Sequence, residues 1–281
     1  MSPPPDDRHR PAEHYENFPV ASWLCPPRLR RPIAAIYWFA RTADDIADEG
    51  SATVEARRAD LFTYRNDLEA CLSGNAGSGR WPGIFAALGS ATRDFALPRQ
   101  PLYDLLDAFA QDVEKTAAGA GYADHIELMD YCRRSANPVG RLLLHLYGVA
   151  DAESLAQSDA ICSALQLINF WQDVSVDLPR GRYYLPEKDC RRRGFTPQAP
   201  SPYELPALVA ELCEWSRELM LAGAPLVHRV PGRAGWELRL VVQGGLRILQ
   251  RIEAIGYRTH ERRPTIGARD LPAMLWAAAW M

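Results

Sequence analysis

Apolar residues recur along most of this chain every three to four positions, the period of a helix with one buried face. No run alternates between apolar and polar residues as a half-buried strand would. A kink is expected at Asn137-Pro138, because a proline removes a backbone donor. The pattern predicts an all-α fold with helices at 27–48, 51–71, 84–95, 102–118, 122–147, 152–178, 205–229 and 235–256.

The domain organisation is predicted from the breaks in this pattern. Residues 1–12 are rich in Pro, Asp and Arg without an apolar segment, which is typical of a disordered terminus. The segment 196–206 contains four prolines and offers one candidate boundary. The piece that follows it has about 75 residues, which is marginal for a separate core. We therefore expect a single domain at 13–281.

Composition excludes several classes of protein. The net charge of −3, with acids and bases interspersed, gives no footprint for nucleic acid. The six cysteines have no CxxC or zinc-type spacing, and no leader or membrane-spanning run is visible. A cytoplasmic protein is expected. The tryptophan-rich tail, 271–281, either packs on the body or contacts a membrane surface, which would make the protein membrane-peripheral.

Two acidic helix faces point to metal chemistry. In the first, Tyr37, Arg41, Asp44 and Asp48 follow one another at steps of four, three and four, so they share one side of a helix. Carboxylates one turn apart repel, and a half-buried face tolerates them mainly when a cation neutralises them. A single pair is weak evidence, because this spacing also occurs by chance on solvated helices.

The second face closes the long helical pattern at 152–178, which contains no Gly and no Pro. Gln166, Asn169, Asp173 and Asp177 lie on one side of it, and no Lys or Arg joins them. Two carboxylates and two amides suit a hard divalent cation, which takes oxygen ligands. The repeat of an acidic face with aromatic and apolar flanks predicts that these helices bind a divalent metal ion.

These residues carry a resemblance to the squalene/phytoene synthase family, the head-to-head prenyl-diphosphate enzymes. The match extends from about residue 14 to 264 and includes Ile252-Glu253 and Tyr257 through Arg262. The blocks that resemble the family's motifs are Ala35 through Asp48, Tyr131-Cys132 through Gly140, Gln166 through Asp177, and Gly181-Arg182-x-Tyr184-Leu185-Pro186.

The resemblance implies an all-α isoprenoid synthase bundle around a central cavity, with Mg²⁺ as cofactor and a prenyl diphosphate as substrate. It implies that Arg182 either contacts the diphosphate or anchors its loop. Tyr131 falls where the family has a tyrosine near the carbocation, and an aromatic face stabilises a cation. Implied metal ligands are Asp44, Asp48, Asn169, Asp173 and Asp177, and the four aspartates with Tyr131 make up the implied catalytic set. Implied substrate contacts are Tyr37, Arg41, Gln166 and Arg262.

The chain also departs from the family pattern. Ser135-Ala136-Asn137 stands where Val-Ala-Gly is usual, Gln172 replaces an arginine, and Gly245 replaces a tyrosine. The block Ser135 to Gly140, together with His14 through Ser22, resembles the hydroxysqualene synthases of bacterial hopanoid pathways. That resemblance implies ionisation of presqualene diphosphate and capture of the cation by water, with no NADPH. We hypothesise that Ser135 or Asn137 positions this water.

Two alternatives stay open at this level. One is a sister enzyme that condenses two farnesyl diphosphates to presqualene diphosphate, or a squalene or phytoene synthase. The other is an inactive homologue that acts as an assembly or lipid-binding partner, and association with other squalene-pathway enzymes is compatible with either. Gln172 and Gly245 keep the inactive reading open, while the two intact aspartate motifs disfavour it.

Overall fold

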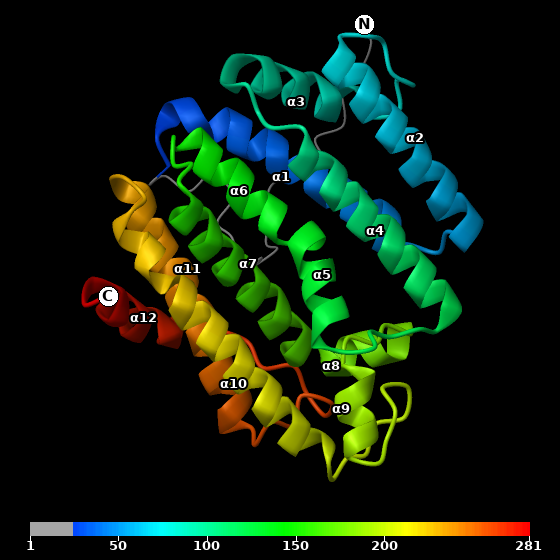
Figure 1. The fold of residues 1–281 in the computed structure, drawn as a ribbon, viewed down its shortest axis with the longest axis vertical. Coiled ribbons are helices and arrows are strands. Elements are labelled where there is room, and N and C mark those ends of the chain that lie inside the picture. Colours follow the sequence, from blue (N-terminus) through cyan, green and yellow to red (C-terminus); the bar gives the residue numbers. More distant parts are fainter. Residues whose placement is uncertain (1–24) are drawn as a thin grey trace, which may run out of the picture.

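The computed structural model describes residues 25–281, which form α-helices joined by loops and short 3-10 turns (Figure 1). Within that range the one extended pairing is an isolated bridge between Thr196 and Ala199. The all-α prediction is confirmed. The helices are α1 (Pro27–Asp48), α2 (Val54–Ser73), α3 (Pro82–Phe95), α4 (Gln100–Ala118), α5 (His125–Ser135), α6 (Asn137–Leu146), α7 (Ala152–Gln172), α8 (Val174–Asp177), α9 (Glu187–Arg192), α10 (Leu205–Gly223), α11 (Arg233–Ala254) and α12 (Leu271–Ala279).

Two helix boundaries differ from those predicted from the sequence. The cap of α2 is Thr53, whose side chain accepts a hydrogen bond from the Ala56 amide at 3.2 Å, and not Ser51 as predicted. Thr53 has extended backbone angles, so its hydroxyl reaches the first free amides of the helix. The predicted kink at Asn137-Pro138 is a complete break, with α5 ending at Ser135 and α6 beginning at Asn137.

The long acidic helix also differs from the prediction, because α7 ends at Gln172 and not at residue 178. Asp173 has φ −100° and ψ 14°, outside helical geometry. The Ser175 amide donates to the Thr259 carbonyl at 3.1 Å, so a partner distant in sequence replaces the intrahelical bond. The short helix α8 follows, and the turn after it ends at Gly181 with φ 73°. The break moves Asp173 to a helix terminus, where its side chain projects from a junction.

Helix α7 runs through the centre of the molecule and packs on α5, α6, α10 and α11 (Figure 1). Its approach to the end of α10 is close. A Cβ atom at Gly223 would lie 2.5 Å from the Gln157 carbonyl oxygen and 2.6 Å from Ile161 Cγ1. Only a residue without a side chain lets the two backbones come this near.

The buried side chains form two apolar clusters. One joins α1–α4 with one side of α6 and includes Phe39, Tyr64 and Leu142; the other is built on α5 and α7–α11 around Trp171. Tyr147 packs against both. The space between the clusters is where the large cavity lies, so the fold provides apolar walls on either side of it.

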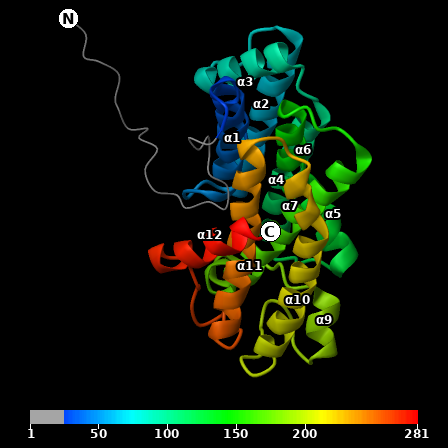
Figure 2. The ribbon, with the colours of Figure 1, turned by 90° about the vertical axis from the view of Figure 1, so that its left-hand side faces the viewer.

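The tail forms α12, which lies against α11 on the face turned toward the viewer in Figure 2. Ala278 is buried in this contact, while Trp276 and Trp280 are 69% and 77% exposed. Among residues 25–281, none of the helices has both the length and the apolar character needed to cross a bilayer.

Candidate active site

A cavity of about 820 Å³ lies between the two apolar clusters. Helices α1, α4, α6, α7 and α11 form its walls, and residues 263–266 close one side. The apolar lining includes Ile36, Phe109 and Leu165. The carboxylates in its lining come from separate elements: Asp44, Asp48 and Glu49 from α1, Asp112 from α4, and Asp173 and Asp177 from the end of α7 and from α8.

Arg182 joins the two acidic motifs. Its Nη2 lies 2.6 Å from Asp48 Oδ1, and its Nη1 lies 3.7 Å from Asp177 Oδ1. All three side chains are largely shielded from solvent. Asp48 and Asp177 are separated by 129 positions in sequence, so this guanidinium shows directly that the two acidic faces meet in space.

The negative charge of this region is held at an energetic cost. Burial is the main cause that raises the pKa of Asp177 to about 7, with nearby Asp173 and Asp48 adding to it and Arg182 opposing it. Burial likewise raises the pKa of Asp48, and Arg182 again opposes the rise. A further positive charge in this cavity would therefore be strongly favoured.

The remaining predicted residues of the two acidic faces also line the cavity. They are Tyr37, Arg41, Gln166 and Asn169. The Arg41 guanidinium pairs with Asp44 at 3.4 Å and with Asp45 at 2.8 Å. Its charge thus lies at the rim of the first acidic motif, within reach of an anion held there.

The segment after α11 places Arg263 in the cavity lining, next in sequence to Arg262, the predicted substrate contact. Arg262 is exposed and lies outside the cavity lining, whereas Arg263 lines it and forms two hydrogen bonds with the Asp173 carboxylate. A hydrogen bond explains which arginine enters the cavity. Gln172 Nε2 donates to the Pro264 carbonyl at 2.7 Å and holds this segment against the end of α7. The tie brings residue 263, not 262, against Asp173.

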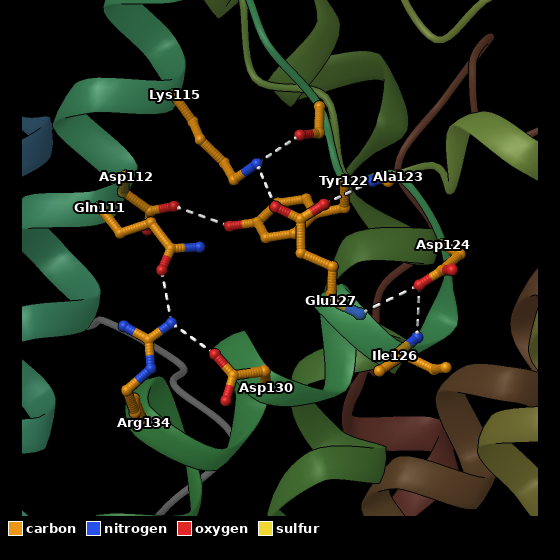
Figure 3. A network of polar contacts seen from close by, with 11 residues as sticks. Gln111, Asp112, Lys115, Tyr122, Ala123, Asp124, Ile126, Glu127, Asp130 and Arg134 are labelled. Atoms are coloured by element: carbon orange, nitrogen blue, oxygen red, sulfur yellow. Dashed lines mark hydrogen bonds and ion pairs between the residues drawn. The ribbon is translucent and has the colours of Figure 1, made fainter.

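Four aromatic rings form one wall around Asp112. Phe170 stacks on Tyr184 with ring centroids 3.8 Å apart, and Tyr131 and Tyr122 lie beside them. The Tyr131 hydroxyl donates to Asp112. Tyr122 donates to the same carboxylate at 3.4 Å (Figure 3). Burial is the main cause that raises the pKa of Asp112 to about 7. This wall offers π faces and a partly protonated carboxyl.

Asp112 and Tyr184 were not singled out from the sequence as site residues. A signal for Asp112 was present, because it lies three residues after Phe109 and seven after Leu105, on the stripe of α4 that lines the cavity. An acid on an otherwise apolar stripe indicates a functional or paired group. Tyr184 belongs to the matched Gly181–Pro186 block, but only the folded loop shows that its ring covers Phe170.

The two candidates for positioning water separate in space. Ser135 lines the cavity, and its buried Oγ has no hydrogen-bond partner among the described residues. Asn137 is buried outside the cavity lining, where its Oδ1 accepts a hydrogen bond from Ser163 Oγ at 2.9 Å. The break between α5 and α6 turns residue 137 toward α7 and leaves residue 135 on the cavity wall.

The donor set fits a divalent metal that is shared with a ligand. Its oxygens come from carboxylates and one amide, which Mg²⁺ prefers. Among residues 25–281, no three His, Cys, Asp or Glu side chains converge closely enough to hold a metal by themselves. Carboxylates instead face each other in small groups across the cavity. Such an arrangement suits metal ions that complete their coordination with phosphate oxygens and water.

Comparison with known proteins identifies the family. Residues 12–270 match the model of squalene/phytoene synthase. The chain belongs to the squalene/phytoene synthase family.

Individual proteins resemble this chain in sequence, and a solved structure resembles it in fold. Hydroxysqualene synthase of Sinorhizobium fredii is 35% identical over 225 residues, 78% of this chain and 73% of that protein. Presqualene diphosphate synthase of Rhodopseudomonas palustris is 29% identical over 263 residues, 92% of this chain and 91% of that protein. The crystal structure of squalene synthase HpnC from Alicyclobacillus acidocaldarius is 35% identical, covers 87% of this chain and 90% of that one, and superposes with a TM-score of 0.76.

Membership in the squalene/phytoene synthase family confirms the expected isoprenoid synthase fold and an isoprenoid synthase activity. The resemblance of His14 through Ser22 to hydroxysqualene synthases lies outside the described residues. Gly245 stands where the family pattern has a tyrosine, and aliphatic side chains pack closely against it. A Cβ there would lie 2.6 Å from Met220 Cε and 3.1 Å from Leu165 Cδ2. This chain therefore has packed aliphatic groups at the position that would hold a phenol.

Proposed function

We propose that this protein is a hydroxysqualene synthase, which converts presqualene diphosphate and water to hydroxysqualene and diphosphate. The observation that carries the proposal is the position of Arg182 between Asp48 and Asp177, at one end of a large cavity with apolar and aromatic walls. A polar end for a diphosphate and an apolar body for long hydrocarbon chains belong to one continuous space. The similarity to hydroxysqualene synthase supports the choice of reaction.

The acidic end binds the diphosphate. Asp44, Asp48, Asn169, Asp173 and Asp177 would hold Mg²⁺, which when bound neutralises phosphate charge and favours breaking of the C–O bond. Arg182 and Arg41 add fixed guanidinium donors beside these carboxylates. Diphosphate then leaves with the bonding electron pair, and the cavity retains the carbocation.

The aromatic wall stabilises the cation. The faces of Tyr131, Tyr184 and Phe170 present negative charge density. Hydrogen bonding to Asp112 fixes the Tyr131 hydroxyl, so its ring holds one orientation. Ser135 Oγ, which is buried and without a described partner, positions the water whose oxygen forms the new C–O bond. The water's proton passes to the diphosphate.

Product analysis tests this proposal. The purified chain is incubated with presqualene diphosphate and Mg²⁺ without any reductant, and the products are analysed by mass spectrometry. We expect a C30 alcohol whose oxygen comes from labelled water. Ser135→Ala should lower the ratio of alcohol to hydrocarbon products, while Ser90→Ala, at an exposed position on α3, should leave it unchanged. An unchanged ratio in Ser135→Ala excludes the water-positioning role.

A second candidate is condensation of two farnesyl diphosphates to presqualene diphosphate. It is favoured by the length of the match to presqualene diphosphate synthase, 92% of this chain. Incubation with farnesyl diphosphate distinguishes the two, because only a condensing enzyme releases diphosphate and forms a C30 diphosphate from it. Absence of diphosphate release from every C15 and C30 substrate would instead favour an inactive homologue.

A further inference from the structure

The outer side of α12 is an exposed apolar surface. From residue 271 to 281 the sequence contains no charged side chain. Leu271, Leu275, Trp276 and Trp280 are 42%, 55%, 69% and 77% exposed. Isolated exposed apolar residues are ordinary, but four on one short helix form a patch of the kind that marks an interaction surface.

This surface continues onto α11. Trp236 is 47% exposed, and the Arg239 guanidinium lies over its ring at 5.0 Å from the centroid. Arg239 also donates to the Ala278 carbonyl at 3.3 Å, which joins the beginning of α11 to the end of α12. Indole rings with guanidinium groups beside them combine an apolar surface with a cationic rim.

The first turn of α1 borders the same region. Cys25 and Ile33 line a small pocket together with Ala234, Glu237 and Leu238 of α11. The first turn carries Arg28, Arg30 and Arg31, all exposed. Figure 2 shows α11 and α12 side by side on the face turned toward the viewer.

The charge of this region is opposite to that of the whole chain. We define the docking face as residues 27–31, 233–239 and 269–281, which contain six arginines and two acids. One of the acids, Asp270, is buried against Arg247 and Arg251. The complete chain has a net charge of −3. A basic face with exposed tryptophans on an acidic protein is complementary to an anionic surface that has an apolar interior.

The small pocket lies between the docking face and the large cavity. Its volume is about 90 Å³ and its walls are mainly apolar. Ile33, Leu143 and Cys162 line both spaces. A thin layer of apolar side chains therefore stands between the reaction cavity and this side of the molecule.

We propose that the docking face binds the surface of an anionic phospholipid bilayer. Trp276, Trp280 and Leu275 enter the interface between headgroups and acyl chains, where indole rings are favoured, and the arginines contact lipid phosphates. Docking itself does not depend on the reaction catalysed. Its use, which rests on the proposed function, is to hold the enzyme at the bilayer, where the water-insoluble hydrocarbon chains of substrate and product are favoured.

Vesicle flotation of the full chain, without substrate, tests the proposal. We expect binding to vesicles of phosphatidylcholine with phosphatidylglycerol and much weaker binding to phosphatidylcholine alone. Trp276→Ser with Trp280→Ser should weaken binding by at least about tenfold, because two large apolar groups no longer insert. Arg28→Glu with Arg31→Glu should also weaken binding by at least about tenfold, through loss of attraction to the anionic surface.

Matched variants control for surface changes elsewhere. Tyr203→Ser removes another aromatic ring, 90% exposed, and Lys188→Glu with Arg191→Glu makes the same change of charge far from the docking face. Both should bind as the original chain does. Failure of the original chain to bind anionic vesicles, or equal binding by the double tryptophan variant, overturns the proposal. A dimer that dissociates on Trp276→Ser with Trp280→Ser, with no vesicle binding, would assign the face to a second copy of the chain.

Discussion

At the scale of single residues, one guanidinium compensates charges that burial disfavours. Arg182 contacts Asp48 and Asp177. Burial raises the pKa of each of these carboxyl groups, and Arg182 partly offsets the rise. Without this arginine, burial would favour the neutral form of both carboxyl groups more strongly. Arg182 is thus a positioning and charge-tuning residue as well as a candidate diphosphate contact.

Arg182→Gln should lower the rate of diphosphate release by on the order of a hundredfold, because a fixed donor beside the leaving group is lost. The pKa values of Asp48 and Asp177 should rise further without the arginine, so the rising limb of the pH–rate profile should move to higher pH. Arg191→Gln, at an exposed arginine on α9 that pairs with Glu187, is the matched control. A rate loss without any shift of the profile would contradict the charge-tuning role.

Asp112→Asn should change how stability depends on pH. With a pKa of about 7 against an ordinary 3.8, folded Asp112 keeps a proton that the unfolded chain has already released between about pH 4 and 7. The stability of the original chain therefore falls as pH rises through this window, by at most about 4 kcal/mol from this group. Asparagine does not titrate and still accepts the hydrogen bond from Tyr131.

Urea denaturation at pH 5 and pH 8, with a chelator present, measures this effect. The unfolding free energy of Asp112→Asn relative to the original chain should be higher at pH 8 than at pH 5. Asp130→Asn is the control, because Arg133 and Arg134 lower the pKa of Asp130. This carboxyl is therefore ionised in the folded and the unfolded chain at both pH values, and its replacement should change stability equally at pH 5 and pH 8. Equal differences at the two pH values for Asp112→Asn would show that its pKa is not raised.

At the scale of elements, the close packing of α7 and α10 and the break at Asp173 position the second acidic motif. The Ser175 amide and the Gln172 side chain bond to Thr259 and Pro264, so the segment after α11 holds the end of α7 in place. The glycine contact at Gly223 holds the other end of α7 against α10. Asp173 and Asp177 are thus held in place by segments that are distant from them in sequence.

Gly223→Ala should destabilise the fold by about 1–3 kcal/mol, because its Cβ would overlap backbone atoms of Gln157 and Ile161 that cannot move independently. Gly83→Ala is the matched control. It lies in the first turn of α3 with nothing within 4 Å of its Cβ position, and it should be neutral or slightly stabilising. Thermal denaturation compares them; equal melting temperatures would show that α7 and α10 can move apart without cost.

At the scale of the whole molecule, two apolar clusters enclose the reaction space, and the acidic motifs close its polar end. The first motif belongs to the α1–α4 side and the second to the α7–α8 side. A ligand that contacts both motifs therefore ties the two sides together. Ligand binding and global stability are linked by this arrangement.

Mg²⁺ and inorganic diphosphate together should raise the melting temperature more than the sum of their separate effects. At a hundredfold excess over Kd, a ligand specific for the folded state adds about 2.7 kcal/mol. Asp48→Asn with Asp177→Asn should abolish the joint effect, and Asp60→Asn, an exposed acid paired with Arg80, should retain it. An equal shift with diphosphate alone would contradict metal-bridged binding.

The sequence by itself determined the helices and both acidic faces. Helical periodicity, prolines and glycines are local signals. For this reason α1, α3, α4 and α11 begin and end within two residues of their predicted bounds. The spacing of Asp44 with Asp48 and of Asp173 with Asp177 is equally local, and it identified the elements that line the cavity. Membership in the family followed from the same local blocks.

Only the tertiary structure decided which side chains share the cavity. Asp112 enters the site because α4 packs beside α5. Arg263 lines the cavity and Arg262 does not, because Gln172 holds Pro264. Ser135 lines the cavity and Asn137 does not, because the chain changes direction between them. These outcomes depend on contacts between residues far apart in sequence, and the geometry of such contacts is fixed by packing and not by the period of any one helix.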